Sequence, residues 1–262
     1  MPIAVETSAL TRRFGDVVAV DALNLQVPAG TFFGFLGPNG AGKSTTIKML
    51  TGLLRIGSGR ASILGHDVDR DAVRAKQLIG VVPEELAVFD RLSGGEYLTF
   101  VGRMYNLAKR PLRERAEELL ELMGLEDNPD KLIVDYSHGM KKKLALAAAL
   151  IHGPRVLFLD EPFEGIDAVA SRMIKDLLAS LVNSGVTVFL TSHILEIVEK
   201  LCSEIAIIHR GRLVANGSLD ALRTGVRVDD EDAGARTLTL EEAFLSLVDA
   251  ESVAPSSLSW LG

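Results

Sequence analysis

The 262-residue sequence has few of the features that distinguish secreted or membrane-spanning proteins. Cys202 is the single cysteine, so no disulfide can form within the chain, as expected for a cytoplasmic protein. The longest apolar run, residues 144–151, is well short of the roughly 18 residues that a membrane-spanning helix needs. The first ten residues have no basic start followed by an apolar stretch, so we expect no signal peptide.

The sequence also lacks a basic excess and an internal repeat. Its net charge is −7, and residues 226–262 contain eight acidic residues against Arg227 and Arg236. The residues before 226 are therefore almost neutral together, which argues against a nucleic-acid partner. The acidic run at 229–232 is expected to be a solvated linker, because blocks of like charge repel one another. A hydrophobic content of 47% is enough for one large α/β domain or two small ones.

What is present indicates an α/β fold. Residues 3–28 are rich in β-branched residues around a break at Gly15-Asp16, which predicts antiparallel strands. From about 88 to 152 the pattern is helical and indicates an inserted helical subdomain. Strands and helices alternate elsewhere, so we expect a mainly parallel sheet that is covered on both faces.

Glycine and proline residues predict the ends of several elements. Pro111 is expected to open one helix and Gly124 to close it, while Arg210-Gly211 is expected to join two strands as a hairpin. The predicted strands are 31–37, 61–65, 78–83, 156–160, 186–192, 204–209 and 212–217, and the helices outside the insertion are 42–52, 168–183 and 194–201.

The segment "GPNGAGKST" at 37–45 matches the phosphate-binding pattern G-x-x-x-x-G-K-[ST] between a predicted strand and a predicted helix. Backbone N–H groups of such a loop form an anion nest. Lys43 would reach the β- and γ-phosphates and Ser44 would ligate Mg²⁺; the alternative is a glycine-rich turn with a chance lysine. The expected nucleotide-binding residues are Gly37, Pro38, Asn39, Gly40, Ala41, Gly42, Lys43, Ser44 and Thr45.

Two further strands end in side chains that suit nucleotide hydrolysis. Asp160 ends the apolar segment "VLFLD" and would hold Mg²⁺ through water, while Glu161 would polarise the attacking water. His193 follows the next strand and could hold the water or Glu161. Alternatively, Glu161 caps a helix or forms a salt bridge, and His193 is structural.

Over roughly residues 3–222, these motifs in this order resemble the nucleotide-binding subunit of an ATP-binding cassette transporter. The resemblance implies a P-loop ATPase domain at 1–225, with a helical subdomain at about 88–152. The family's Ser-Gly-Gly-Gln signature lies about twenty residues before the Asp-Glu pair, which fits "YSHGM" at 136–140 and not "LSGGE" at 92–96. We therefore expect Ser93 and Glu96 only to form a capping box at a helix N-terminus.

The resemblance also implies a dimer with a homologous or identical chain, arranged head to tail. Ser137 and Gly139 of one subunit would bind ATP held by the other, and the interface would include His138, Met140 and Asp167. His138 and Met140 depart from the family's Gly and Gln. Lysines 141–143 are expected to be a solvated face, or to add positive potential.

Two more site residues follow from the resemblance. Glu84 stands where the family usually has a Gln that touches Mg²⁺ and water; a carboxylate can ligate the ion but repels phosphate. Phe14 stands where an aromatic residue stacks on adenine, although it could instead be a core residue of the first hairpin.

The tail, residues 226–262, is expected to be the acidic linker followed by a short helix at 239–248. Thr239 and Glu242 form a capping-box pattern, and Leu240, Phe244 and Leu247 share one face. Trp260 either docks on the domain or ends the chain freely.

The function implied by the resemblance is ATP hydrolysis that drives a separate transmembrane permease. The tail and the altered signature resemble an export-type subfamily, with the chain at the inner face of the cell membrane. The alternatives are a soluble cassette ATPase in translation or DNA repair, and a nucleotide-gated module that hardly hydrolyses ATP.

Overall fold

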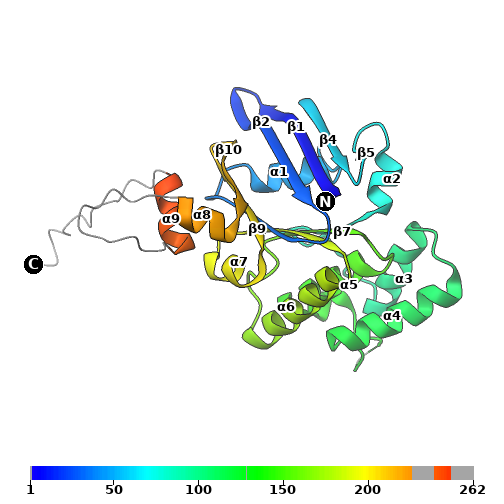
Figure 1. Cartoon of the computed structure of the whole chain (residues 1–262). Coiled ribbons are helices and arrows are strands. Elements are labelled where there is room, and N and C mark those ends of the chain that lie inside the picture. Colours follow the sequence, from blue (N-terminus) through cyan, green and yellow to red (C-terminus); the bar gives the residue numbers. More distant parts are fainter. Residues whose placement is uncertain (1, 128, 226–238, 249–262) are drawn as a thin grey trace, which may run out of the picture.

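The computed structural model describes residues 2–127, 129–225 and 239–248 (Figure 1). The strands are β1 (Ile3–Phe14), β2 (Val17–Pro28), β3 (Phe32–Leu36), β4 (Ser58–Ile63), β5 (His66–Asp67), β6 (Ile79–Val82), β7 (Val156–Asp160), β8 (Thr187–Ser192), β9 (Glu204–His209) and β10 (Arg212–Ser218). The helices are α1 (Lys43–Leu50), α2 (Ala72–Gln77), α3 (Gly94–Met104), α4 (Lys109–Met123), α5 (His138–Leu150), α6 (Ala168–Asn183), α7 (Leu195–Leu201), α8 (Leu219–Gly225) and α9 (Leu240–Leu247), with a 3₁₀ turn, η1, at Ile133–Asp135.

The strands form two sheets, which confirms the predicted α/β fold. One is antiparallel, in the order β2-β1-β4-β5, and the other has the order β10-β9-β3-β8-β7-β6. In the second sheet β9, β3, β8, β7 and β6 are parallel, and only β10 pairs antiparallel. The predicted β9–β10 hairpin is confirmed: Arg210 and Gly211 both have positive φ, as a type I′ turn requires.

The five parallel strands of the six-stranded sheet are largely buried on both faces, between two hydrophobic layers. In β7, Val156 and Phe158 belong to the cluster shared with α1 and the antiparallel sheet, whereas Leu157 and Leu159 belong to the cluster under α5 and α6. This alternation follows the two-residue period of a strand. Figure 1 shows the antiparallel sheet and α1 on one side of the central strands and helices α3 to α6 on the other.

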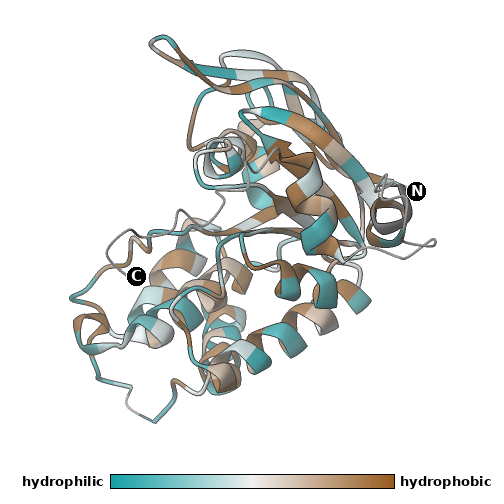
Figure 2. Ribbon diagram, turned by 90° about the vertical axis from the view of Figure 1, so that its left-hand side faces the viewer, coloured by the Kyte–Doolittle hydropathy of each residue, from teal (hydrophilic) through white to brown (hydrophobic). Residues whose placement is uncertain are grey.

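Three helices, α3, α4 and α5, make up most of the segment between β6 and β7. Ser93 caps α3 in a reciprocal box with Glu96, which confirms the capping role expected for the early Ser-Gly-Gly. Gly124, with φ 62°, ends α4 as predicted, but α4 begins at Lys109 rather than at Pro111, which lies within its first turn. Figure 2 shows hydrophobic and hydrophilic residues mixed along the helices that lie below the sheets, as expected for helices with one buried face.

The described part of the tail is one helix that packs against the domain. In α9, Thr239 and Glu242 form the predicted capping box, and the N–H of Leu240 donates to a carboxylate oxygen of Glu199 in α7. Helix α8, which was not predicted, also contacts α9. The acidic run at 229–232 and Trp260 lie outside the described residues.

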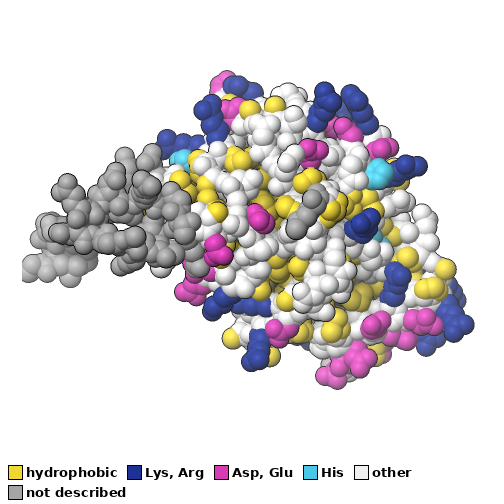
Figure 3. All heavy atoms as spheres, viewed as in Figure 1, with side chains coloured by type: hydrophobic (Ala, Val, Ile, Leu, Met, Phe, Trp, Pro, Cys, Tyr) yellow, Lys and Arg dark blue, Asp and Glu magenta, His cyan; other side chains and the backbone are white. Residues whose placement is uncertain are grey.

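The described surface mixes both signs of charge. On the face shown in Figure 3, basic and acidic side chains lie interspersed. None of the helices within residues 2–127, 129–225 and 239–248 is both long and apolar enough to cross a bilayer.

Candidate nucleotide-binding site

The predicted site residues follow four neighbouring parallel strands. Lys43 and its loop follow β3, His193 follows β8, Glu161 follows β7, and Glu84 lies two residues after β6. Since these strands are adjacent in the order β3-β8-β7-β6, their carboxyl ends meet at one edge of the sheet. A pocket of about 310 Å³ lies there, lined by Ala19, Pro38, Asn39, Gly40, Gly42, Lys43, Ser44, Thr45, Glu84, Glu161, Glu164 and His193.

The glycines of the 37–45 loop are needed for two different reasons. A Cβ at Gly37 would lie 2.3 Å from the carbonyl oxygen of Ile208, and one at Gly42 would lie 2.4 Å from that of Ala19. The backbone of β2 and β9 therefore packs against the loop on the side away from the pocket. At Gly40, with φ 78°, a Cβ would meet nothing within 4 Å, so the loop is open on the pocket side. Such an opening fits an anion that accepts backbone hydrogen bonds.

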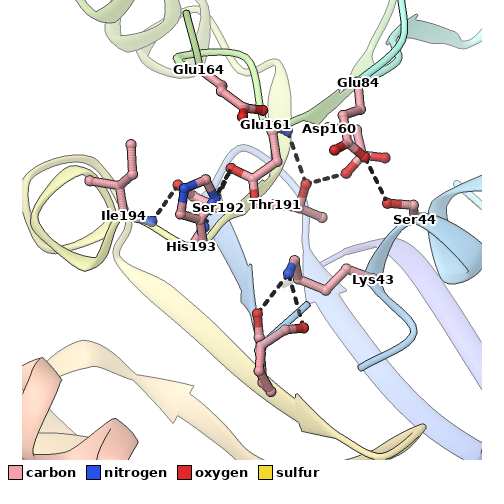
Figure 4. A network of polar contacts seen from close by, with 12 residues as sticks. Lys43, Ser44, Glu84, Asp160, Glu161, Glu164, Thr191, Ser192, His193 and Ile194 are labelled. Carbon is pink, nitrogen blue, oxygen red and sulfur yellow. Dashed lines mark hydrogen bonds and ion pairs between the residues drawn. The ribbon is translucent and has the colours of Figure 1, made fainter. Parts of the chain in front are cut away.

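Lys43 and Ser44 begin α1, where the helix dipole also favours a negative ligand. The Lys43 side chain is 7% exposed, and its Nζ donates to the carbonyl oxygens of Gly37 (2.6 Å) and Pro38 (3.3 Å) (Figure 4). The ammonium thus joins two carbonyl groups of the loop that would also bind the phosphates. Ser44 Oγ lies 3.5 Å from Glu84 Oε2.

Asp160 is held by a threonine that the sequence analysis missed. Its carboxylate is 3% exposed and accepts a short hydrogen bond from the hydroxyl of Thr191, which is fully buried in β8. The same hydroxyl oxygen accepts the N–H of Glu161 at 3.2 Å. Thr191 therefore connects the two neighbouring carboxylate residues, although nothing in its strand distinguishes it by sequence alone.

Glu161 lies in a left-handed backbone conformation, with φ 48°, which is uncommon for a residue with a side chain. Its carboxylate is buried, and its Oε2 accepts the backbone N–H of His193 at 3.4 Å and lies 3.0 Å from His193 Nδ1, at ion-pair distance (Figure 4). Glu161 is thus held at the pocket wall beside His193, and the ion pair between them is the salt bridge that one alternative expected.

Lys142 corrects one of our predictions. The lysines at 141–143 were expected to form a solvated face, but Lys142 is only 4% exposed, because α5 turns this side chain toward the loop after β7. Its Nζ donates to the carbonyl oxygen of Glu161 at 2.9 Å and to that of Glu164. Lys141, in contrast, pairs with Asp90 at the surface at 3.1 Å.

The donors for a magnesium ion are oxygen atoms, as that ion prefers. Ser44 and Glu84 face each other, and Asp160 lies beside them (Figure 4). Among the described residues, no three His, Cys, Asp or Glu side chains converge as metal ligands. This set fits Mg²⁺, which usually takes one or two carboxylates and completes its shell with water and phosphate oxygens.

Phe14 is at the tip of the β1–β2 hairpin and does not line the pocket. Its side chain is 47% exposed, so it is not the core residue of the alternative interpretation. The guanidinium of Arg12 lies 5.0 Å from the centre of its ring. The residue of the β1–β2 hairpin that does line the pocket is Ala19, in β2, which the sequence analysis did not single out.

The signature segment lies apart from the pocket of its own chain. Neither Ser137 nor Gly139 lines that pocket, and Ser137 instead caps α5 by accepting the N–H of Met140 at 3.2 Å. His138 is exposed at the first position of the helix.

Asp167 also has a local role, as the N-cap of α6. It accepts the N–H groups of Ala170 and Val169, both at 2.9 Å. These hydrogen bonds, with Ala170 the larger cause, lower the pKa of its carboxyl.

A phosphate-binding loop, an Asp-Glu strand end and an inserted helical segment define a P-loop nucleotide hydrolase. The ABC transporter family model matches residues 20–164. The chain is 38% identical to the daunorubicin/doxorubicin resistance ATP-binding protein of Streptomyces peucetius, over 98% of this chain and 80% of that one. It is 40% identical to the linearmycin resistance ATP-binding protein of Bacillus subtilis, over 80% of this chain and 67% of that one.

A solved structure described as the ATP-binding subunit of an ABC transporter superimposes with a TM-score of 0.85. It is 28% identical and covers 93% of this chain and 99% of its own. The chain therefore belongs to the ABC transporter family, as an ATP-binding subunit with ATPase activity. None of these three matches bears a name from translation or DNA repair, so they give the alternative of a soluble ATPase no support.

Proposed function

We propose that this chain hydrolyses ATP as one half of a head-to-tail dimer and thereby drives export by a separate membrane subunit. The observation that carries the proposal is the convergence of Lys43, Glu161 and His193 on one pocket, with Ser137 and Gly139 outside it. The pocket of a single chain thus contains the phosphate cradle and the base but not the signature residues, which lie elsewhere in the chain. A second copy, or a paralogous subunit, would supply the signature.

Within the pocket, the loop amides and Lys43 bind the phosphate chain, while Phe14, which lies outside the pocket at the tip of the β1–β2 hairpin, stacks on adenine. Glu161 orients a water toward the γ-phosphorus and takes its proton as the new P–O bond forms and the bond to ADP breaks. His193 keeps the carboxylate of Glu161 in place through its backbone N–H, which donates at 3.4 Å, and through the ion-pair contact of its Nδ1 at 3.0 Å. Mg²⁺, held by Ser44, Glu84 and Asp160, would neutralise charge on the phosphate oxygens.

The hydrolysis step is tested by steady-state ATPase assays of the wild type and Glu161→Gln. Loss of a general base lowers such rates by about 100-fold or more, so the variant should be nearly inactive while still binding ATP. Equal rates in the two proteins would refute the role of Glu161 and favour a nucleotide-gated binding module.

The assembly and direction of transport are supported by the relatives, both of which are named for resistance to a toxic compound. Export would place the chain at the inner face of the cell membrane, attached through its partner. The membrane subunit would select the cargo.

The test of assembly is to purify the tagged chain from its own cells after mild solubilisation of the membranes. An integral membrane protein in near-stoichiometric amount is the expected result. Recovery only from the soluble fraction, together with ribosomes or nucleic acid, would contradict the transporter assignment.

A further inference from the structure

Lys142 is a buried lysine between the signature segment and the catalytic loop. It is in the second turn of α5, the helix that begins directly after Ser137. Its ammonium bonds to the carbonyl oxygens of Glu161 and Glu164, both in the loop between β7 and α6. One side chain thus joins the helix of the signature to the residue proposed as the catalytic base.

A second contact lies one helical turn away, on the same face of α5. A Cβ at Gly165 would lie 3.0 Å from Cδ2 of His138, so the imidazole packs closely on the loop backbone. Residues four apart on a helix are neighbours, which places His138 and Lys142 side by side against this loop. The loop is therefore held to α5 at two successive points.

The surroundings of Lys142 show that burying its ammonium has a free-energy cost, which particular hydrogen bonds offset. Besides bonding to the two carbonyl groups, Lys142 lines a small cavity together with apolar side chains, among them Val82, Leu146 and Leu159. Burial lowers the pKa of its ammonium, while the charges of Glu164 and Glu161 act in the opposite direction. A buried ammonium is stable only when its hydrogens are paired, and here backbone carbonyls of the loop pair them.

We propose that Lys142 is a positioning residue for ATP hydrolysis, because it fixes the 161–167 loop to the helix that carries Ser137. This inference rests on the proposed roles of Glu161 and of the head-to-tail dimer. In such a dimer, Ser137 meets the nucleotide of the opposite site while Glu161 serves the site of its own chain. Lys142 therefore couples the contact of Ser137 with the nucleotide in the opposite site to the orientation of Glu161 in the site of its own chain.

The experiment compares Lys142→Met and Lys142→Arg with the control Lys141→Met. The control removes the same charge one residue earlier on the same helix, from a side chain that pairs with Asp90 at the surface. For each purified chain we would measure kcat and KM for ATP, equilibrium binding of a fluorescent ATP analogue, and the melting temperature. Lys142→Gln is measured in parallel, because methionine in place of a buried ammonium can prevent folding.

We expect Lys142→Met and Lys142→Gln to lower kcat by about 10- to 100-fold, the effect of a misplaced catalytic group, while analogue affinity changes less than about twofold. Lys142→Arg, which keeps a charged donor, should recover most of the rate, and Lys141→Met should resemble the wild type. A KM-against-kcat split of this kind would not arise from a merely structural role.

Three results would overturn the inference: wild-type kcat in both Lys142→Met and Lys142→Gln, an equal loss in Lys141→Met, or a raised KM with unchanged kcat. Wild-type activity no higher than that of Glu161→Gln would instead refute the proposed function. The two failures are therefore distinguishable in one series of assays.

Discussion

Thr191 offers a quantitative test of how the two carboxylate residues are held. Its hydroxyl donates to Asp160 and accepts the N–H of Glu161, and the side chain is fully buried. Thr191→Val replaces the hydroxyl by a methyl group of similar size, so no cavity opens and the lost hydrogen bonds can be measured almost alone.

The magnitude follows from which partners lose their bonds. The Asp160 carboxylate loses a charge-assisted hydrogen bond in a site that is 3% exposed, which costs about 1.5–3 kcal/mol. The N–H of Glu161 also lies 3.3 Å from the carbonyl oxygen of Thr191, so its loss adds only about 0.5–1 kcal/mol. We therefore expect Thr191→Val to lower the free energy of unfolding by about 2–4 kcal/mol, or Tm by on the order of 5–10 °C.

The assay is urea unfolding followed by circular dichroism, supported by thermal melts, with Thr191→Ser as the matched control. Serine keeps the hydroxyl and loses a methyl group, so it should be more stable than valine at this position. A Thr191→Val protein within about 0.5 kcal/mol of the wild type, or less destabilised than Thr191→Ser, would refute the reasoning.

Three further predictions concern the site and its pH response. Glu84→Gln should lower KM for ATP by roughly 2- to 10-fold, because a carboxylate beside Ser44 repels phosphate, whereas the control Glu85→Gln should not; an unchanged ATPase profile would remove Glu84 from the site. Phe14→Ala should weaken binding of ATP roughly 5- to 100-fold in a titration and Phe14→Tyr should not, since stacking on a base is worth about 1–3 kcal/mol. Burial lowers the pKa of His152 below its ordinary value near 6.5, so its neutral form contributes stability that is complete above pH 6.5 and is lost as the pH falls below it. Thermal melts from pH 7.5 to 5.5 should therefore show a smaller loss of Tm for His152→Gln than for the wild type, and parallel losses would exclude this cause.

Elements with their own start and stop signals could be predicted from sequence. Helix α6 was predicted at 168–183 and has these bounds, because Asp167 caps its first turn and Gly185, with φ 91°, follows its end. Helices α2 and α8 were missed, whereas α7, which is as short as α8, was predicted, because six or seven residues give only a weak helical period. Their stability comes from packing against other elements, which a local pattern does not contain.

The residues of the candidate site also fall into two groups, those that could be predicted from the sequence and those that could not. The 37–45 loop is continuous in sequence, and Asp160 and His193 each lie at a strand end, so topology alone predicted that they meet. Lys142 stands in a run of three lysines that reads as a solvated face; only the packing of α5 on the catalytic loop turns the middle one inward. Thr191 is one of three polar residues in β8, with Thr187 and Ser192, and its partners are set by the pairing of β7 with β8.

The most direct test of the central claim is the mass in solution of Glu161→Gln with and without Mg²⁺ and ATP, measured by size-exclusion chromatography with light scattering. The account predicts the 28.2 kDa mass of one chain without nucleotide and twice that mass with it, because unhydrolysed ATP would hold two copies together. Adding Ser137→Arg, which blocks the signature but leaves the pocket intact, should restore the single-chain mass while the ATP analogue still binds. A Glu161→Gln protein that binds ATP and keeps the mass of one chain, or a dimer unaffected by Ser137→Arg, would contradict a head-to-tail dimer of two identical chains.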